Sequence, residues 1–194
     1  MSYLTTHFEE TRQVLEQLNI NKIEQIVKII ANTHDQGGRL FFLGVGGSAA
    51  NASHAVNDFR KICGIEAYAP TDNVSELTAR TNDEGWDTAY VNWLKGCNLC
   101  DKDIIFVFSV GGGNVEKNIS VNIVSSLEYG KKVGAKVVGI VGRDGGYTKK
   151  VGDNVILVPT IDKKLVTPYS ESFHSVIWHC LVSHPILQKK KMKW

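Results

Sequence analysis

Two glycine-rich turns, each between an apolar strand-like run and a helix-like segment, constrain the fold of this chain more than any other feature. The first turn, residues 44–48 (G-V-G-G-S), follows the apolar run 39–43, and the second, residues 109–114 (S-V-G-G-G-N), follows the apolar run 103–108. Backbone N–H groups in such turns can bind an anion, and the dipole of a following helix adds partial positive charge. The pair predicts a site for a phosphorylated ligand, although such turns can also serve tight packing alone.

Neither turn carries a nucleotide-binding fingerprint. A P-loop needs a lysine and then serine or threonine directly after its last glycine, and neither cluster has them. The Rossmann pattern G-x-G-x-x-G is matched only in part, because Ala49 stands in its last place, although the acidic Glu66 lies downstream. A dinucleotide domain does not require a second glycine cluster on another strand. The dinucleotide interpretation is therefore the weaker one.

The rest of the chain alternates strand-like and helix-like segments, which predicts a doubly wound α/β fold. Helices are expected over 4–35, with a break near residues 19–21, and at 47–63, 73–81, 84–97, 114–133 and 166–184. Strands are expected at 39–44, 103–109, 136–142 and 154–158, with a short one near 65–68. Their near-continuous apolar runs are typical of parallel strands covered on both faces. Ligands of such sheets bind beyond the carboxyl ends of the strands, where both turns lie.

Length and composition indicate one ordinary globular domain. The chain has 194 residues, of which 43% are hydrophobic and 22% charged, and its net charge is +2. We divide it into N-terminal helices (1–36), an α/β core with its closing helix (37–188) and a basic tail (189–194), which we expect to be solvated and frayed. The weak charge gives no reason to expect nucleic acid as a partner. No run reaches membrane-spanning length and no signal peptide is recognisable, so we expect a cytoplasmic protein without a membrane partner.

The cysteines favour a structural role over a redox or zinc centre. Cys97 and Cys100 have C-x-x-C spacing, but no second pair accompanies them, and they end a helix-like segment instead of opening one. A position at the start of a helix is what lowers the pKa of a reactive thiol. We expect reduced, structural thiols.

Histidines and carboxylates gather on two of the expected helices. His54 and Asp58 are four residues apart and share a helix face. On the last long helix, Glu171 and His174 are i,i+3 neighbours, and His179 lies two turns beyond Glu171. Imidazole and carboxylate groups could hold a divalent metal, or they could act as acid and base. Each histidine could equally be an ordinary hydrogen-bonded surface residue.

Together these features resemble the SIS (sugar isomerase) phosphosugar-binding family, and within it the phosphoheptose isomerases. The resemblance covers nearly the whole chain: the N-terminal helices, the G-x-G-G-S turn, the T-N-D run 81–83, the serine-led second turn and the closing E-x-x-H-x-x-x-x-H helix. It implies a three-layer α/β/α sandwich with a five-stranded parallel sheet (flavodoxin-like). It also implies a homotetramer with active sites between subunits, assembled through the N-terminal helices.

The resemblance further implies a reaction and a set of site residues. The family moves a carbonyl between C2 and C1 of sedoheptulose 7-phosphate through an enediol, giving D-glycero-D-manno-heptose 7-phosphate. Asp58 would be the base and His179 the acid/base histidine, with Zn²⁺ held by His54, Asp58, Glu171 and His179. The second turn would bind the phosphate, and the remaining substrate-binding residues would bind the sugar. The substrate-binding residues implied are Gly46, Gly47, Ser48, Asn82, Asp83, Ser109, Gly111, Gly112, Asn114 and Glu171.

The chain departs from the family pattern at several of these positions. Val45 replaces the usual asparagine, and the second turn lacks two hydroxyl donors that the family loop carries. Asp58 is one methylene shorter than the family's glutamate, and Glu171 replaces a glutamine. Two alternatives follow from these departures. One is an isomerase for another phosphosugar, and the other is a non-catalytic phosphosugar-binding or interaction module, like the SIS-type proteins that associate with the replication initiator DnaA.

Overall fold

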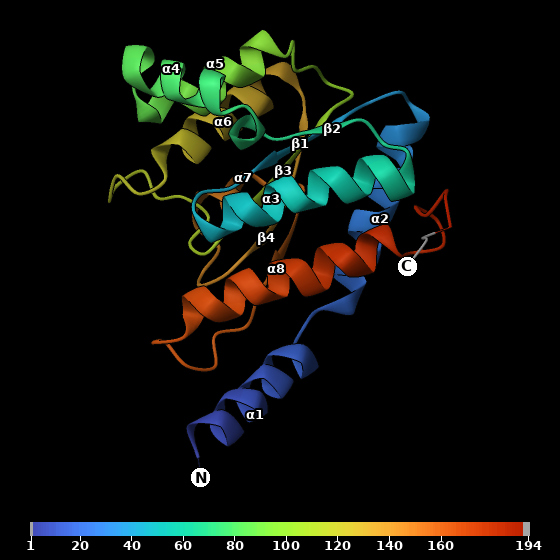
Figure 1. The fold of residues 1–194 in the computed structure, drawn as a ribbon, viewed down its shortest axis with the longest axis vertical. Coiled ribbons are helices and arrows are strands. Elements are labelled where there is room, and N and C mark those ends of the chain that lie inside the picture. The colour runs from blue at the N-terminus through green and yellow to red at the C-terminus, as the bar shows by residue number, and fades with distance from the viewer. Residues whose placement is uncertain (1, 192–194) are drawn as a thin grey trace.

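The computed structural model describes residues 2–191, which form a three-layer α/β/α sandwich around a parallel sheet (Figure 1). The sheet has five strands in the order β2-β1-β3-β4-β5, which confirms the predicted flavodoxin-like architecture. The strands are β1 (Leu40–Leu43), β2 (Ala67–Tyr68), β3 (Ile104–Ser109), β4 (Lys136–Val141) and β5 (Asn154–Leu157).

Alternate residues of each strand face opposite layers and build two apolar cores. Leu40 and Phe42 of β1 belong to one core, whereas Phe41 and Leu43 belong to the other. The first core joins the sheet to α2 (Ile20–Asp35), α3 (Gly47–Asp58) and α8 (Val166–Val182). The second joins it to α5 (Trp86–Gly96), α6 (Val121–Val133) and α7 (Gly146–Val151), with α4 (Val74–Glu84) packed against α5.

Most predicted elements are confirmed to within a few residues. The predicted break in the N-terminal helical region separates α1 (Tyr3–Glu16) from α2, and the Asn19 side chain caps α2 by accepting a hydrogen bond from the N–H of Lys22. The helix predicted at 47–63 changes at residue 59 into a π-helical turn, Phe59–Cys63. It ends at Gly64, which has the left-handed φ that favours glycine. A short 3-10 turn, Pro70–Asp72, follows β2.

Two local predictions around the second glycine turn were wrong. The helix expected over 114–133 begins only at Val121, and residues 114–120 form a loop closed by two backbone hydrogen bonds between Asn114 and Ile119. Asn118 and Ser120 both have left-handed φ values, which a continuous helix cannot contain. The second error is that α7 was missed, because the glycines at 142–146 indicated only a turn.

The two ends of the chain differ in how they are held. Figure 1 shows α1 extending away from the sheet, and its main polar tie is the Tyr169 hydroxyl, which donates to Glu10 at 2.7 Å. The expected frayed tail is in fact anchored at its start, because the N–H groups of Lys189 and Lys190 both donate to the carbonyl of Ile62. The rest of that predicted segment, 192–194, lies outside the described residues. No helix between residues 2 and 191 is both long and apolar enough to cross a bilayer.

The four cysteines differ in burial, from the buried Cys63 to the exposed Cys180. Cys63, Cys97, Cys100 and Cys180 are all free. Cys97 follows the last residue of α5, and burial raises the pKa of its thiol. Burial also raises the pKa of Cys63, to about 12. A redox cysteine needs the opposite shift.

His174 is the one histidine that the fold encloses completely within the described residues. Its ring is 0% exposed and stacks on Phe108 of β3 with 5.2 Å between ring centroids. Neither ring nitrogen has a hydrogen-bond partner of good geometry among the described residues. Burial lowers its pKa to about 4, although the nearby carbonyls of Ile140 and Ser109 oppose the shift. His174 is therefore a neutral core residue at neutral pH.

We predict that His174 makes the fold sensitive to acid. The unfolded chain takes up this proton near the ordinary histidine pKa of 6.5, whereas the folded chain takes it up only near 4. The free energy of unfolding should therefore fall as the pH drops from 6.5 to 4, by up to roughly 3 kcal/mol. Denaturant unfolding of the wild type and of His174→Leu across this range checks it. Parallel pH dependences in the two proteins would contradict the prediction.

Candidate active site

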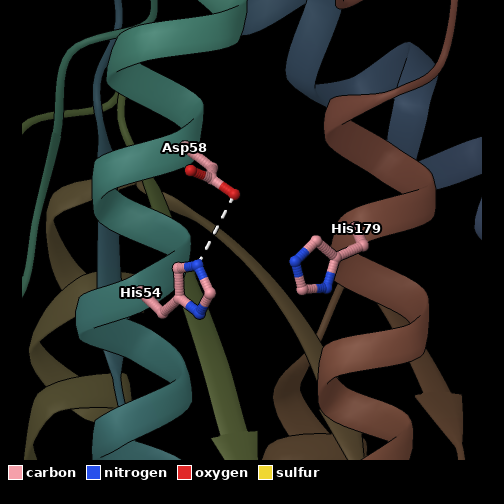
Figure 2. Close-up of side chains that lie close together, drawn as sticks. All are labelled: His54, Asp58 and His179. Atoms are coloured by element: carbon pink, nitrogen blue, oxygen red, sulfur yellow. Dashed lines mark ion pairs between the residues drawn. The ribbon is translucent and has the colours of Figure 1, made fainter. Parts of the chain in front are cut away.

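Two helices of one layer, α3 and α8, lie side by side and present polar side chains to each other (Figures 1 and 2). His54 and Asp58 come from α3, and His179 comes from α8. One ligand atom from each lies within 4.8 Å of the others. We call these three residues the His–Asp–His cluster.

The carboxylate of the cluster is buried and held by its neighbour. Asp58 is 4% exposed, and the amide of Asn57 donates to its Oδ1 at 2.8 Å. The other oxygen, Oδ2, lies 3.7 Å from Nε2 of His54, whose side chain is 58% exposed (Figure 2). One carboxylate oxygen thus faces His54 while the other is occupied by Asn57.

The tautomer of His179 follows from its backbone contact. Its Nδ1 lies 2.8 Å from the carbonyl oxygen of Ser175, which can only accept a hydrogen bond. Nδ1 therefore carries the proton, and Nε2 remains available as an acceptor or a metal ligand. A hydrogen bond of this kind on the far nitrogen is typical of metal-ligating histidines.

The donor set fits a divalent transition metal. Two imidazole nitrogens and one carboxylate oxygen are ligands that zinc accepts, and three protein ligands leave a position open for water or substrate. The cluster can therefore hold a metal ion, or its residues can move protons directly.

Glu171 lies apart from the cluster. Its carboxylate packs against Cα of Gly47 at the N-terminus of α3, so a Cβ on that glycine would collide with it. The partial positive charge of a helix N-terminus favours a carboxylate in this place. The structure thus brings together three of the four predicted metal ligands, and the ligand role of Glu171 stays a prediction.

The first glycine turn has a conformation that demands glycine. Gly46 has φ 63° and ψ −129° and begins α3, and its carbonyl accepts the N–H groups of Ala49 and Ala50. Ser48 is 2% exposed within the first turn of the helix. The hydroxyl of Tyr90 donates to the carbonyl of Gly44 at 2.7 Å and ties this turn to α5.

The second glycine turn is held by Ser109 from within and by Thr148 of α7, and it does not open a helix. The hydroxyl of Ser109 accepts the N–H of Gly112 at 3.0 Å, and the carbonyl of Gly112 accepts the hydroxyl of Thr148 at 2.8 Å. The Asn114 side chain accepts the N–H of Lys117. Gly111 lies in the chain between Ser109 and Gly112, the two residues joined by the first of these hydrogen bonds.

A cavity of about 180 Å³ adjoins the second turn. One of its lining residues is Lys150, which the sequence did not single out. The cavity is lined by Gly113, Asn114, Val115, Glu116, Gly146, Tyr147 and Lys150. Lys150 comes from α7, the element that the sequence indicated only as a turn, so no pattern linked this lysine to the glycine turn. Lys150 and Glu116 line the same cavity, so one cationic and one anionic residue lie beside the turn.

The two remaining predicted residues lie at the end of α4. Asn82 and Asp83 are exposed, and the Asn82 amide donates to Asp83 at 2.7 Å. The structure shows no contact between them and the His–Asp–His cluster. Their proposed contact with sugar hydroxyls stays a prediction.

A parallel α/β/α sandwich with glycine turns at its strand ends is the architecture of sugar isomerase (SIS) domains, and comparisons support this class. The sequence matches the SIS domain family over residues 3–142. The phosphoheptose isomerase of Sulfurimonas denitrificans is 32% identical over 180 residues, covering 90% of this chain and 87% of that protein. The phosphoheptose isomerase of Geobacter sulfurreducens is 31% identical over 184 residues, covering 91% and 92%.

A solved structure supports the fold independently. A phosphoheptose isomerase from Francisella tularensis superposes with a TM-score of 0.82 at 24% identity, covering 98% of this chain and 100% of that chain. The chain therefore belongs to the SIS domain family and, within it, to the phosphoheptose isomerases.

We predict that the His–Asp–His cluster binds a divalent metal. The wild-type protein should bind Zn²⁺ in a 1:1 ratio, and His179→Ala should weaken binding by more than about a hundredfold because it removes one of three ligands. Isothermal titration with metal-free protein measures this. His184→Ala is the matched control, since His184 lies near Glu24 and outside the cluster. Equal zinc affinity in His179→Ala and the wild type would contradict the prediction.

Proposed function

We propose that this protein isomerises D-sedoheptulose 7-phosphate to D-glycero-D-manno-heptose 7-phosphate, in the cytoplasm. The observation that carries the proposal is the His–Asp–His cluster on α3 and α8, in a chain whose relatives over about nine-tenths of its length are phosphoheptose isomerases. A ketose–aldose isomerisation needs a base for a carbon-bound proton and an acid for the oxygens. A buried carboxylate facing two imidazoles supplies those groups.

The proposed chemistry assigns one step to each residue. The Asp58 carboxylate takes a proton from C1 of the ketose, and the electron pair forms the C1–C2 double bond of the enediol as O2 gains a proton. Return of the proton to C2, with loss of the O1 proton, gives the aldose. His179, whose unprotonated Nε2 faces the cluster, accepts the proton that O1 loses and delivers it to O2, so the two oxygens exchange one proton. Asn57 holds the base in orientation through Oδ1.

A metal would assist this chemistry from the same cluster. Zn²⁺, which the resemblance implies, would polarise the carbonyl and stabilise the negative charge of the enediolate. His54, Asp58 and His179 would hold it, and Glu171 of α8, whose carboxylate lies against the N-terminus of α3, is a further candidate. Because Nε2 of His179 can either ligate a metal or carry a proton, the two roles are exclusive at any moment.

The substrate would span the two glycine turns. We assign the phosphate to the second turn, where Ser109, Gly111, Gly112 and Asn114 lie, as the family resemblance implies; Lys150 and Glu116 line the cavity beside that turn. Gly46, Gly47 and Ser48 of the first turn would hold the sugar near the cluster. Asn82 and Asp83 would contact sugar hydroxyls.

The proposed base can be tested by an isosteric change. Asp58→Asn keeps the side-chain volume but removes the proton acceptor, so we expect kcat to fall by about 10²–10⁴-fold. The assay uses a panel of C5 to C7 ketose phosphates with and without Zn²⁺. Asp35→Asn, on the exposed end of α2, is the control.

The outcomes of that assay separate the alternatives. Unchanged turnover in Asp58→Asn would remove Asp58 from the mechanism. Turnover of a different sugar only would indicate another phosphosugar isomerase. A wild-type protein that binds no metal and converts none of these sugars would favour the non-catalytic binding module.

We also propose that the protein assembles as a homotetramer through α1, with active sites at the subunit interfaces. Leu4, Phe8 and Leu15 follow one face of α1 and are 65%, 68% and 53% exposed. Isolated apolar residues are common on protein surfaces, but an apolar helix face with no cover is typical of an interface.

A charge on this face should disrupt the assembly. We expect Phe8→Asp to shift the protein from a tetramer to smaller species, because the carboxylate would be buried without a partner. Light scattering after size-exclusion chromatography measures the mass. Thr6→Asp, about 200° around the helix from Phe8, is the matched control. A tetramer that survives Phe8→Asp unchanged would contradict this interface.

A further inference from the structure

Trp178 contacts both histidines of the His–Asp–His cluster. Its indole is 0% exposed, stacks on the His179 ring at 3.6 Å between centroids, and meets the His54 ring edge-on at 4.7 Å. The two imidazoles lie 5.4 Å apart and nearly perpendicular, at 88°. One rigid ring on α8 thus contacts two histidines that come from different helices.

The indole is itself held by Asn51 of α3. Oδ1 of Asn51 accepts the Nε1–H of Trp178 at 3.1 Å and the hydroxyl of Ser175 at 2.6 Å. Its Nδ2 donates to the carbonyls of Gly47 and Glu171, both at 3.2 Å. Each polar atom of the Asn51 side chain therefore makes at least one hydrogen bond from α3 to α8.

A histidine can ligate a metal only with the right ring orientation and the right tautomer, and these contacts fix both. The stacked indole limits the orientation of the His179 ring, and the carbonyl of Ser175 sets its tautomer. Asn51 holds both Trp178 and Ser175 by hydrogen bonds. A buried indole N–H without an acceptor is costly, so loss of Asn51 would favour another orientation of the ring.

We propose that Asn51 and Trp178 act as a coupled pair of positioning residues that hold His54 and His179 in geometry for metal binding. Neither residue is a ligand, and neither touches the reacting atoms. The inference rests on the metal-binding role proposed for the cluster.

Cobalt binding tests the pair without an activity assay. We would titrate the metal-free wild type, Trp178→Phe, Asn51→Leu and the double variant with Co²⁺ and record the visible absorption bands, which report coordination geometry. Each single variant should lose about tenfold in Co²⁺ affinity and show altered bands. The double variant should be no weaker than the worse single variant, because both changes break one chain of contacts.

The control variant separates positioning from a general loss of packing. Trp93→Phe removes an indole that is 7% exposed, in the core on the other face of the sheet. It should leave Co²⁺ affinity and the absorption bands unchanged. If Asn51→Leu does not fold, the comparison of Trp178→Phe with Trp93→Phe still decides the question.

The possible failures are distinguishable. A wild type that binds Co²⁺, together with Trp178→Phe and Asn51→Leu variants of wild-type affinity and spectrum, would overturn this inference and leave the proposed function standing. Independent, additive losses in the double variant would overturn the coupling. A wild type that binds no Co²⁺ would overturn the metal role and this inference together.

Discussion

The packing of α3 against α8 is the contact on which the rest of the site depends. His54 and Asp58 can meet His179 only because these helices lie in the same layer and close together. Small side chains on α3 permit this approach, since Ala52 and Ala55 are buried in the core that also contains Trp178. The site is therefore a consequence of core packing between two helices that are more than a hundred residues apart in the chain.

The sheet determines where the two glycine turns lie relative to that contact. β1 and β3 are hydrogen-bonded neighbours, and the register pairs Leu43 with Val107, so β3 continues to Ser109 beyond the end of β1. The second turn consequently begins further along the strand direction than the first. A ligand that reaches both turns must extend beyond the carboxyl edge of the sheet, which suits an elongated phosphosugar.

The sequence predicted what periodicity and glycine placement can encode, and it missed what depends on tertiary contacts. Continuous apolar runs identified the buried strands, and helical spacing together with the family resemblance singled out His54, Asp58, Glu171 and His179. The start of α6 was misplaced because an antiparallel bridge from Asn114 forms only once the loop closes. Nothing in the sequence indicated that Asn51 and Trp178 belong to the site. A polar residue such as Asn51 in a helix usually indicates a surface position, and a large apolar residue such as Trp178 usually indicates a core position.

The two carboxylates that set this chain apart from the family pattern have different electrostatic surroundings. Glu171 has its carboxylate against Gly47 at the N-terminus of α3, where the helix dipole favours negative charge. Asp58 is enclosed and faces an imidazole on one side and an amide on the other. The extra negative charge at position 171 therefore need not enter the cluster. Asp58 is the one carboxylate among the three residues of the cluster, and its shorter side chain can serve as base only if the substrate approaches α3 closely, which the small residues of that helix allow.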